Sequence, residues 1–248
     1  MDVKRIRGQA DLQILNRDII KYMAMIAMLL NHIAHIFLTR GTPLYEVLED
    51  IGFFTAPVMC FFLVEGYEHT RSKMKYGFRL MLFAVVSQIP YELVFHNGLL
   101  NMIYTLLCCF LILAVMERVY YPFLKMIVVM LLMFATLVGD WPLITPILTV
   151  LLYNSRGNRR KAALGFGVVF LLFVILNVQN YMDGPGDWTA YAVLHAALAG
   201  SGIIAAAMAV LVLYNGQRAA RGQNFSKWFF YFFYPAHLMA LYLIKIVL

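Results

Sequence analysis

One apolar run near the N-terminus carries most of the side chains that are suited to proton transfer. Its polar positions follow one another at steps of three and four, which places them on one stripe of a helix: Asp18, Lys21, Met25, Met28, His32 and His35. A neutral imidazole can serve as a general base near neutral pH. Asn31 lies one turn before His35 and is expected to hydrogen-bond it. We therefore take Asn31, His32 and His35 as candidate catalytic residues; the alternative is a hydrogen-bonded packing stripe between helices.

The last apolar run holds a second polar group. Tyr234 and His237 are three residues apart, so they are expected to face one cavity. Pro235 between them marks a bend or a broken helix, because proline removes a backbone donor. Both side chains are candidate catalytic residues, with a purely structural kink as the alternative.

A polar and basic stretch follows the second apolar run. Glu65 and His69 lie one helical turn apart and are expected to pair. Arginine and lysine match phosphate groups in charge and geometry. We predict a phosphate-binding patch at the inner surface that consists of Glu65, His69, Arg71, Lys75 and Arg79, with Arg159 and Arg160. The alternative is that these residues only set membrane topology and contact anionic lipid.

The elements that position these residues are membrane spans. Of the 248 residues 62% are hydrophobic and only 13% are charged, which is far more apolar material than a soluble core can bury. Nine apolar runs lie at 18–39, 51–66, 77–95, 99–117, 122–138, 141–153, 162–179, 189–214 and 228–248. The runs at 51–66 and 141–153 are short and are expected to be tilted, broken or re-entrant. We predict an all-α, polytopic transmembrane bundle of about nine spans, with residues 1–17 as a short cytoplasmic segment and residues 18–248 as one membrane domain.

The distribution of basic residues predicts how this bundle is oriented in the membrane. With the N-terminus in the cytoplasm, eighteen of the twenty Lys and Arg residues lie inside, and only Arg40 and Lys245 lie outside. Residues 40–50, with Glu46, Glu49 and Asp50, are then an outer loop. The net charge of +7 therefore reflects topology, and we expect membrane lipids, not nucleic acid, as partners. The predicted location is the plasma membrane, the inner membrane if the source is bacterial.

The cysteines indicate neither a metal site nor a disulfide. Cys60, Cys108 and Cys109 all lie within apolar runs, and no CxxC or Cys/His zinc spacing occurs. We expect neither a disulfide framework nor a metal cofactor.

Short motifs along the chain carry a family resemblance. They are NHI at 31–33, PVMCFFLVEGYEHTR at 57–71, YGFRL at 76–80, SQIPYE at 87–92, NMIYTL at 101–106 and FYPAHL at 233–238. In this order and spacing the sequence resembles the TraX-like family, whose namesake is linked to N-terminal acetylation of conjugative pilin. The family is similar in turn to multi-spanning membrane acyltransferases. It more often has Asp-His where this chain has Asn31-His32, and an asparagine stabilises an imidazolium less well than a carboxylate does.

The resemblance implies an acyltransferase that uses acetyl-CoA from the cytoplasm. Joined to the residue pattern, it predicts that the basic inner loops hold the phosphates of CoA and that the thioester reaches His32. His32 would deprotonate the acceptor, which is a peptide N-terminus, a glycan hydroxyl or a small amine, or would carry the acetyl group transiently. Tyr234, His237, Asn31 or Asn101 would donate a hydrogen bond to the developing oxyanion.

Three other functions stay open at this point. Polar stripes through spans also suit a transporter or proton-coupled permease, although the chain shows no internal repeat. A non-catalytic membrane assembly factor fits the same composition. A b-type haem held between His32 and His237 is the third alternative.

Overall fold

The computed structural model describes residues 13–182 and 188–248, and the regular secondary structure in this part of the chain is helical apart from isolated bridges. In chain order the helices are α2 (Arg17–Phe37), α3 (Pro43–Gly52), α4 (Thr55–His69), α5 (Lys73–Phe95), α6 (Met102–Arg118), α7 (Pro122–Ala135), η1 (Thr136–Val138), α8 (Ile144–Asn154), α9 (Arg159–Asn177), η2 (Val178–Tyr181), α10 (Trp188–Ala199), α11 (Ser201–Met208), η3 (Ala209–Leu213) and α12 (Gln223–Val247). The all-α prediction is confirmed. Most of the predicted segment 1–17 lies outside the described residues.

Capping side chains explain where several helices begin. The side chain of Asn16 accepts hydrogen bonds from the backbone amides of Asp18 and Ile19 at the start of α2. Asn101 caps α6 and Asn158 caps α9 in the same way. Each of these oxygens satisfies amides that the first turn of a helix leaves unpaired.

The helices have the length and surface of membrane spans. Six stretches are long and apolar enough to cross a bilayer: Arg17–Phe37, Pro43–His69, Lys73–Phe95, Arg159–Asn177, Ala190–Leu213 and Phe225–Val247. Large apolar side chains are exposed along the outer helices, as Phe123, Leu131 and Phe134 are on α7, and α7 buries none of its residues. A water-soluble protein does not leave such surface uncovered, so the chain is an integral membrane protein. The count of nine spans and the cytoplasmic N-terminus stay predictions.

The two apolar runs that are short in the sequence, 51–66 and 141–153, form different structures. Together α3 and α4 span Pro43–His69, 27 residues, so the second run is not short once α3 is added to it. By contrast α8 has 11 residues, about 16 Å at 1.5 Å per residue, against a hydrocarbon core of about 30 Å. It packs against α4, α6 and α9.

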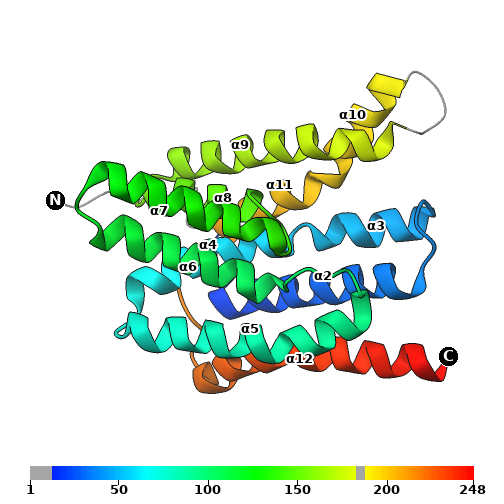
Figure 1. The fold of residues 1–248 in the computed structure, drawn as a ribbon, viewed down its shortest axis with the longest axis horizontal. Coiled ribbons are helices and arrows are strands. Elements are labelled where there is room, and N and C mark those ends of the chain that lie inside the picture. Colours follow the sequence, from blue (N-terminus) through cyan, green and yellow to red (C-terminus); the bar gives the residue numbers. More distant parts are fainter. Residues whose placement is uncertain (1–12, 183–187) are drawn as a thin grey trace.

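The helices run back and forth along the long axis of the molecule (Figure 1). The described chain start, the α4–α5 turn and the segment that leads into α12 lie at one end. The α2–α3 turn, with Arg40, and the C-terminal end of α12, with Lys245, lie at the opposite end. The bundle therefore has a basic end, where most described Lys and Arg residues lie, and an opposite end poor in them.

The prediction of an outer loop at residues 40–50 is wrong. Pro43–Gly52 forms α3, which folds back along α2. Thr42 caps this helix by accepting a hydrogen bond from the amide of Tyr45, and Pro43 occupies a first-turn position that proline favours. The acidic residues of this stretch therefore lie on a packed helix and not in a free loop.

A glycine allows α2 and α3 to approach closely. A Cβ atom at Gly52 would overlap the side chain of Asn31. Asn31 itself is fixed there, because its amide nitrogen donates to the carbonyl oxygen of Glu49 at 3.3 Å. Small residues at helix contacts are typical of membrane bundles, where packing replaces the hydrophobic effect.

We predict that Gly52→Ala destabilises the protein by about 1–3 kcal/mol, because the added methyl group forces α2 and α3 apart. The melting temperature of the detergent-solubilised protein measures this effect. Gly167→Ala is the matched control, since Gly167 lies inside α9 with open space around its Cβ position. Equal melting temperatures for the two variants would contradict the close approach.

Candidate functional site

Two histidines from distant parts of the sequence form a buried pair. His32 of α2 and His237 of α12 are 6% and 7% exposed. The Nδ1 atom of His32 lies 2.8 Å from Nε2 of His237, and the two rings are parallel within 1°. A haem iron with these two nitrogens as ligands on its opposite faces would hold them about 4 Å apart, at about 2 Å each, whereas the distance in this pair is that of a direct hydrogen bond.

The hydrogen bonds assign the protons of this pair. Nδ1 of His237 lies 2.8 Å from the carbonyl oxygen of Phe233, which can only accept, so this nitrogen carries a proton. In a neutral ring Nε2 of His237 is then an acceptor, and Nδ1 of His32 donates to it. The remaining nitrogen, Nε2 of His32, keeps a free lone pair. The arrangement is that of a base oriented by a second group.

Aromatic rings enclose the pair. Phe95 and Tyr234 lie edge-on to His32, with ring centroids at 5.4 and 6.3 Å, and Tyr234 lies 5.6 Å from His237. Tyr234 is 5% exposed, and its hydroxyl proton has no acceptor among the described residues, although the backbone amide of Met102 faces its oxygen. A buried hydroxyl proton without an acceptor costs free energy, so this group is available to a ligand.

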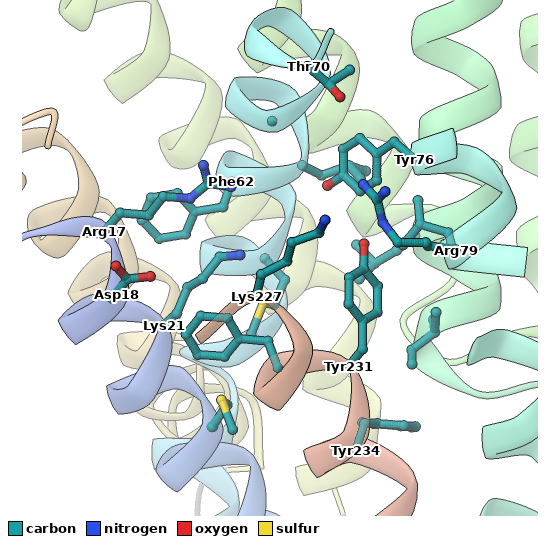
Figure 2. Close-up of a pocket in the computed structure, with 18 of the residues that line it drawn as sticks. Arg17, Asp18, Lys21, Phe62, Thr70, Tyr76, Arg79, Lys227, Tyr231 and Tyr234 are labelled. Atoms are coloured by element: carbon teal, nitrogen blue, oxygen red, sulfur yellow. The ribbon is translucent and has the colours of Figure 1, made fainter. Parts of the chain in front are cut away.

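A cavity of about 560 Å³ opens toward the basic end and reaches Tyr234 (Figure 2). Its cations are Arg17, Lys21, Arg71, Arg79, Arg218 and Lys227. Deeper in, apolar side chains line it: Met25, Met28, Met59, Met102, Leu80, Ile103 and Leu106. In Figure 2 the side chains of Lys21, Lys227 and Arg79 extend into the same space, with Thr70 toward one end and Tyr234 at the other. The cavity therefore suits a ligand with an anionic head and a narrow, less polar arm.

The charges in this cavity are not balanced. Of its six Lys and Arg side chains, a salt bridge within the described residues is shown only for Arg17, whose Nε lies 3.7 Å from Glu65. The one acid in the lining, Asp18, is engaged by the backbone amide of Ala219 at 2.9 Å. The amine of Lys21 lies over the rings of Phe230 and Phe62, at 4.8 and 5.7 Å. Several cations that share one cavity without a carboxylate partner favour an anionic ligand.

A short strap, residues 214–222, closes one side of the cavity mouth. It pairs with the segment before α2: Asn215 donates to the carbonyl of Leu15 at 2.9 Å, and Arg17 donates to that of Gln217 at 2.9 Å. Gly216 and Gly222 both have positive φ angles, which allow the sharp turns. Through these bonds the strap brings Arg218 to the cavity.

The opposite side of the mouth is held by the α4–α5 turn. Glu117 of α6 accepts hydrogen bonds from Tyr67 of α4 and from Lys73 of α5. Lys73 also lies over the ring of Tyr67, at 4.4 Å. This three-helix contact fixes the turn that carries Arg71.

The structure brings together only part of the predicted phosphate patch. His69, Arg71 and Arg79 line the cavity, while Glu65, Lys75, Arg159 and Arg160 do not. The predicted pairing of Glu65 with His69 is wrong at the level of side chains. Nδ1 of His69 binds the backbone carbonyl of Glu65 at 2.9 Å, and the Glu65 carboxylate accepts from the hydroxyl of Tyr214 at 2.7 Å.

The predicted catalytic residues separate into two groups. Tyr234 lines the cavity, and His32 and His237 lie beside it, with their rings 6.3 and 5.6 Å from that of Tyr234, although neither histidine is part of the lining. His35 does not bond Asn31 as expected; its Nδ1 lies 2.9 Å from the hydroxyl of Tyr45. Asn31 instead joins α2 to α3, as described above.

Sequence reasoning missed several cavity residues. The charge pattern predicts only a topological role for Arg17 and Lys227, and no pattern in the sequence marks Tyr76, yet all three line the cavity. One signal was present for Arg17, because it directly precedes the stripe that begins at Asp18. Lys227 lies ten residues before His237 on the same helix and gives no such signal.

We predict that inorganic pyrophosphate raises the melting temperature of the solubilised protein, because it binds the unpaired cations of the native cavity. At a hundred times its Kd a ligand stabilises by about 2.7 kcal/mol. Arg79→Gln and Lys227→Gln are expected to weaken this shift. Arg160→Gln, an exposed cation outside the cavity, is expected to leave it unchanged. An equal shift in all three variants would contradict a cavity site.

Comparison with known proteins places the whole described bundle in one family. The model of the family described as TraX protein matches residues 16–245. The chain is also similar to the "Probable fimbrial assembly protein FimC, serogroup H1" of Dichelobacter nodosus, with 32% identity over 236 residues, which cover 90% of this chain and 92% of that protein. No solved structure matches significantly. The match spans both histidines and every described cavity residue, and the chain belongs to the TraX family.

Proposed function

We propose that this protein is an integral membrane acyltransferase that takes an acetyl group from acetyl-CoA. The observation that supports it best is the cavity that joins unpaired cations at the basic end to Tyr234, beside the His32–His237 pair. By the distribution of basic residues this end faces the cytoplasm, where CoA is found. The predicted plasma-membrane location belongs to the same proposal.

The distance along α2 from the cavity mouth to the depth of His32 matches the length of the phosphopantetheine arm of CoA. From Lys21 to His32 there are eleven residues of α2, about 16 Å at 1.5 Å per residue. The phosphopantetheine arm is an amide chain equivalent to between four and five extended residues, also about 16 Å. With the phosphates on Lys21, Arg79 and Lys227, the thioester therefore reaches the depth of His32.

The proton assignments give His32 its role. Nε2 of His32 takes the proton of the acceptor as the acceptor atom attacks the thioester carbonyl. The new bond forms, and the carbonyl becomes an oxyanion to which the hydroxyl of Tyr234 donates. When this intermediate collapses, the C–S bond breaks, and the CoA sulfur takes the proton back from His32. No proton is gained or lost by the protein over the cycle.

His237 acts through His32. Its Nε2 accepts the Nδ1–H of His32 and so orients the ring and stabilises the imidazolium that forms. The carbonyl of Phe233 holds His237 in the required tautomer. This second histidine occupies the role that the resemblance assigned to the residue before His32.

The acceptor is proposed only by class. A peptide N-terminus, a glycan hydroxyl and a small amine all have the proton that His32 would remove. The similarity to a protein described as a probable fimbrial assembly protein favours an acceptor that takes part in pilus or fimbria assembly. The same description favours a second candidate function, a non-catalytic assembly factor.

We predict that His32→Gln lowers acetyl transfer by a factor of about 10²–10⁴, because general-base catalysis contributes this much. Membranes that contain the protein are incubated with radiolabelled acetyl-CoA, and the labelled products are separated and counted. His195→Gln is the control, since His195 lies on α10 beside Tyr191, away from the pair.

The two candidate functions differ in this assay. Normal transfer by His32→Gln would remove the proposed role of His32. Wild-type membranes that label nothing, together with His32→Gln cells that still assemble fimbriae, would favour the non-catalytic function.

A further inference from the structure

A second chain of hydrogen bonds lies one helical turn beyond His32. The hydroxyl of Tyr45 lies 2.9 Å from Nδ1 of His35 and 3.0 Å from Oε1 of Glu49. The same carboxylate oxygen lies 3.4 Å from Nε2 of His35. Tyr45 and Glu49 belong to α3, the helix that the sequence did not predict. The proposed function uses none of these contacts.

The direction of these bonds is fixed by chemistry. A carboxylate can only accept, so the hydroxyl of Tyr45 donates to Glu49. The same hydroxyl then accepts from Nδ1–H of His35. In the neutral ring, Nε2 of His35 keeps its lone pair. The carboxylate therefore holds the tautomer of His35 through a phenol, much as the Phe233 carbonyl holds the tautomer of His32 through His237.

The position of this chain is between the buried pair and the end of the bundle opposite the cavity mouth. His32 and His35 are three residues apart on α2, which brings their Cβ atoms within about 5–6 Å. The ring of Phe95 contacts both, at 5.4 and 6.5 Å between centroids. The His35 side chain is 35% exposed, whereas Tyr45 is 3% exposed. His35 thus links the buried pair to the α2–α3 end, where Figure 1 shows the turn between these helices.

We infer that His35 is the acceptor-binding residue of this active site and that Tyr45 and Glu49 are its positioning residues. The acceptor arrives from the α2–α3 end and donates to Nε2 of His35 through a second N–H or a neighbouring O–H, distinct from the proton that His32 removes, which aligns the reacting atom with His32. The donor occupies the cavity on the other side of Tyr234. This inference rests on the proposed function and adds to it the place where the acceptor binds.

Charge at this entrance narrows the class of acceptor. Glu49 and Asp50 of α3 are the carboxylates nearest to His35 at this entrance, with Arg40 in the turn before α3 as the nearby cation. One oxygen of Asp50 is buried without a partner among the described residues. A negatively charged reacting group would be repelled by these carboxylates, so the acceptor is neutral or cationic where it reacts.

The test separates donor binding from acceptor binding. Hydroxylamine, a small neutral acyl acceptor, is titrated against the purified full chain with saturating acetyl-CoA, and CoA release is measured as the rate above that of a protein-free sample, because hydroxylamine also cleaves thioesters unaided. Tyr45→Phe and Glu49→Gln are each expected to raise KM for hydroxylamine at least tenfold and to leave KM for acetyl-CoA unchanged. The double variant is expected to be no worse than Tyr45→Phe alone, because the three residues act as one unit.

Glu46→Gln is the matched control, an acid on the same helix outside the hydrogen-bonded chain, and is expected to behave as wild type. An unchanged KM for hydroxylamine in Glu49→Gln would overturn the inference, as would equal changes in both KM values, which indicate a general structural defect. Glu49 is only partly buried, so its variant tests the inference even if Tyr45→Phe folds poorly. Absence of CoA release from the wild type would overturn the proposed function itself, a result distinct from failure of these variants alone.

Discussion

The structure depends on one constraint, that polar groups inside a bilayer must find partners within the protein. Helix α2 carries four of them along one side, and each draws another segment toward it. Asp18 is met by the strap, Asn31 and His35 by α3, and His32 by α12. Hydrogen bonds thus determine which segments pack against α2, because in lipid apolar side chains alone do not favour one helix over another as a packing partner. This makes α2 the axis around which the site is built.

The cavity departs from that constraint. Elsewhere in the described residues only a few buried polar atoms lack a partner, such as Ser87 Oγ and one oxygen of Asp50, but at the basic end most cations of the lining have no carboxylate. Holding like charges together at a membrane surface costs free energy, which a bound anion would recover. Glu65 has the opposite role: it compensates Arg17 and is itself fixed by Tyr214, so only part of the positive charge stays available. Structural pairing and ligand binding thus use different members of one basic cluster.

The sequence predicts what depends on local periodicity. The helices, the stripe that ends at His35 and the pairing of Tyr234 with His237 all follow from spacing along one element. Contacts between elements are not encoded in that way. The acidic composition of residues 43–52 suggested solvent, yet this stretch is a helix held by a cap and by the contact at Gly52. The partner of His35 therefore could not be predicted, and Arg159 and Arg160 were placed in the phosphate patch by charge alone.

The distance along the chain between the two histidines has a consequence for biosynthesis. His32 and His237 are separated by 205 residues, so the first described helix enters the membrane long before its partner exists. At about 5–20 residues per second, the ribosome needs roughly 10–40 s to supply α12. During that interval the imidazole of His32 has neither its hydrogen bond to His237 nor the ring of Tyr234 beside it. The nascent chain must accommodate this group by other means, and the buried pair is completed only when α12 has been made.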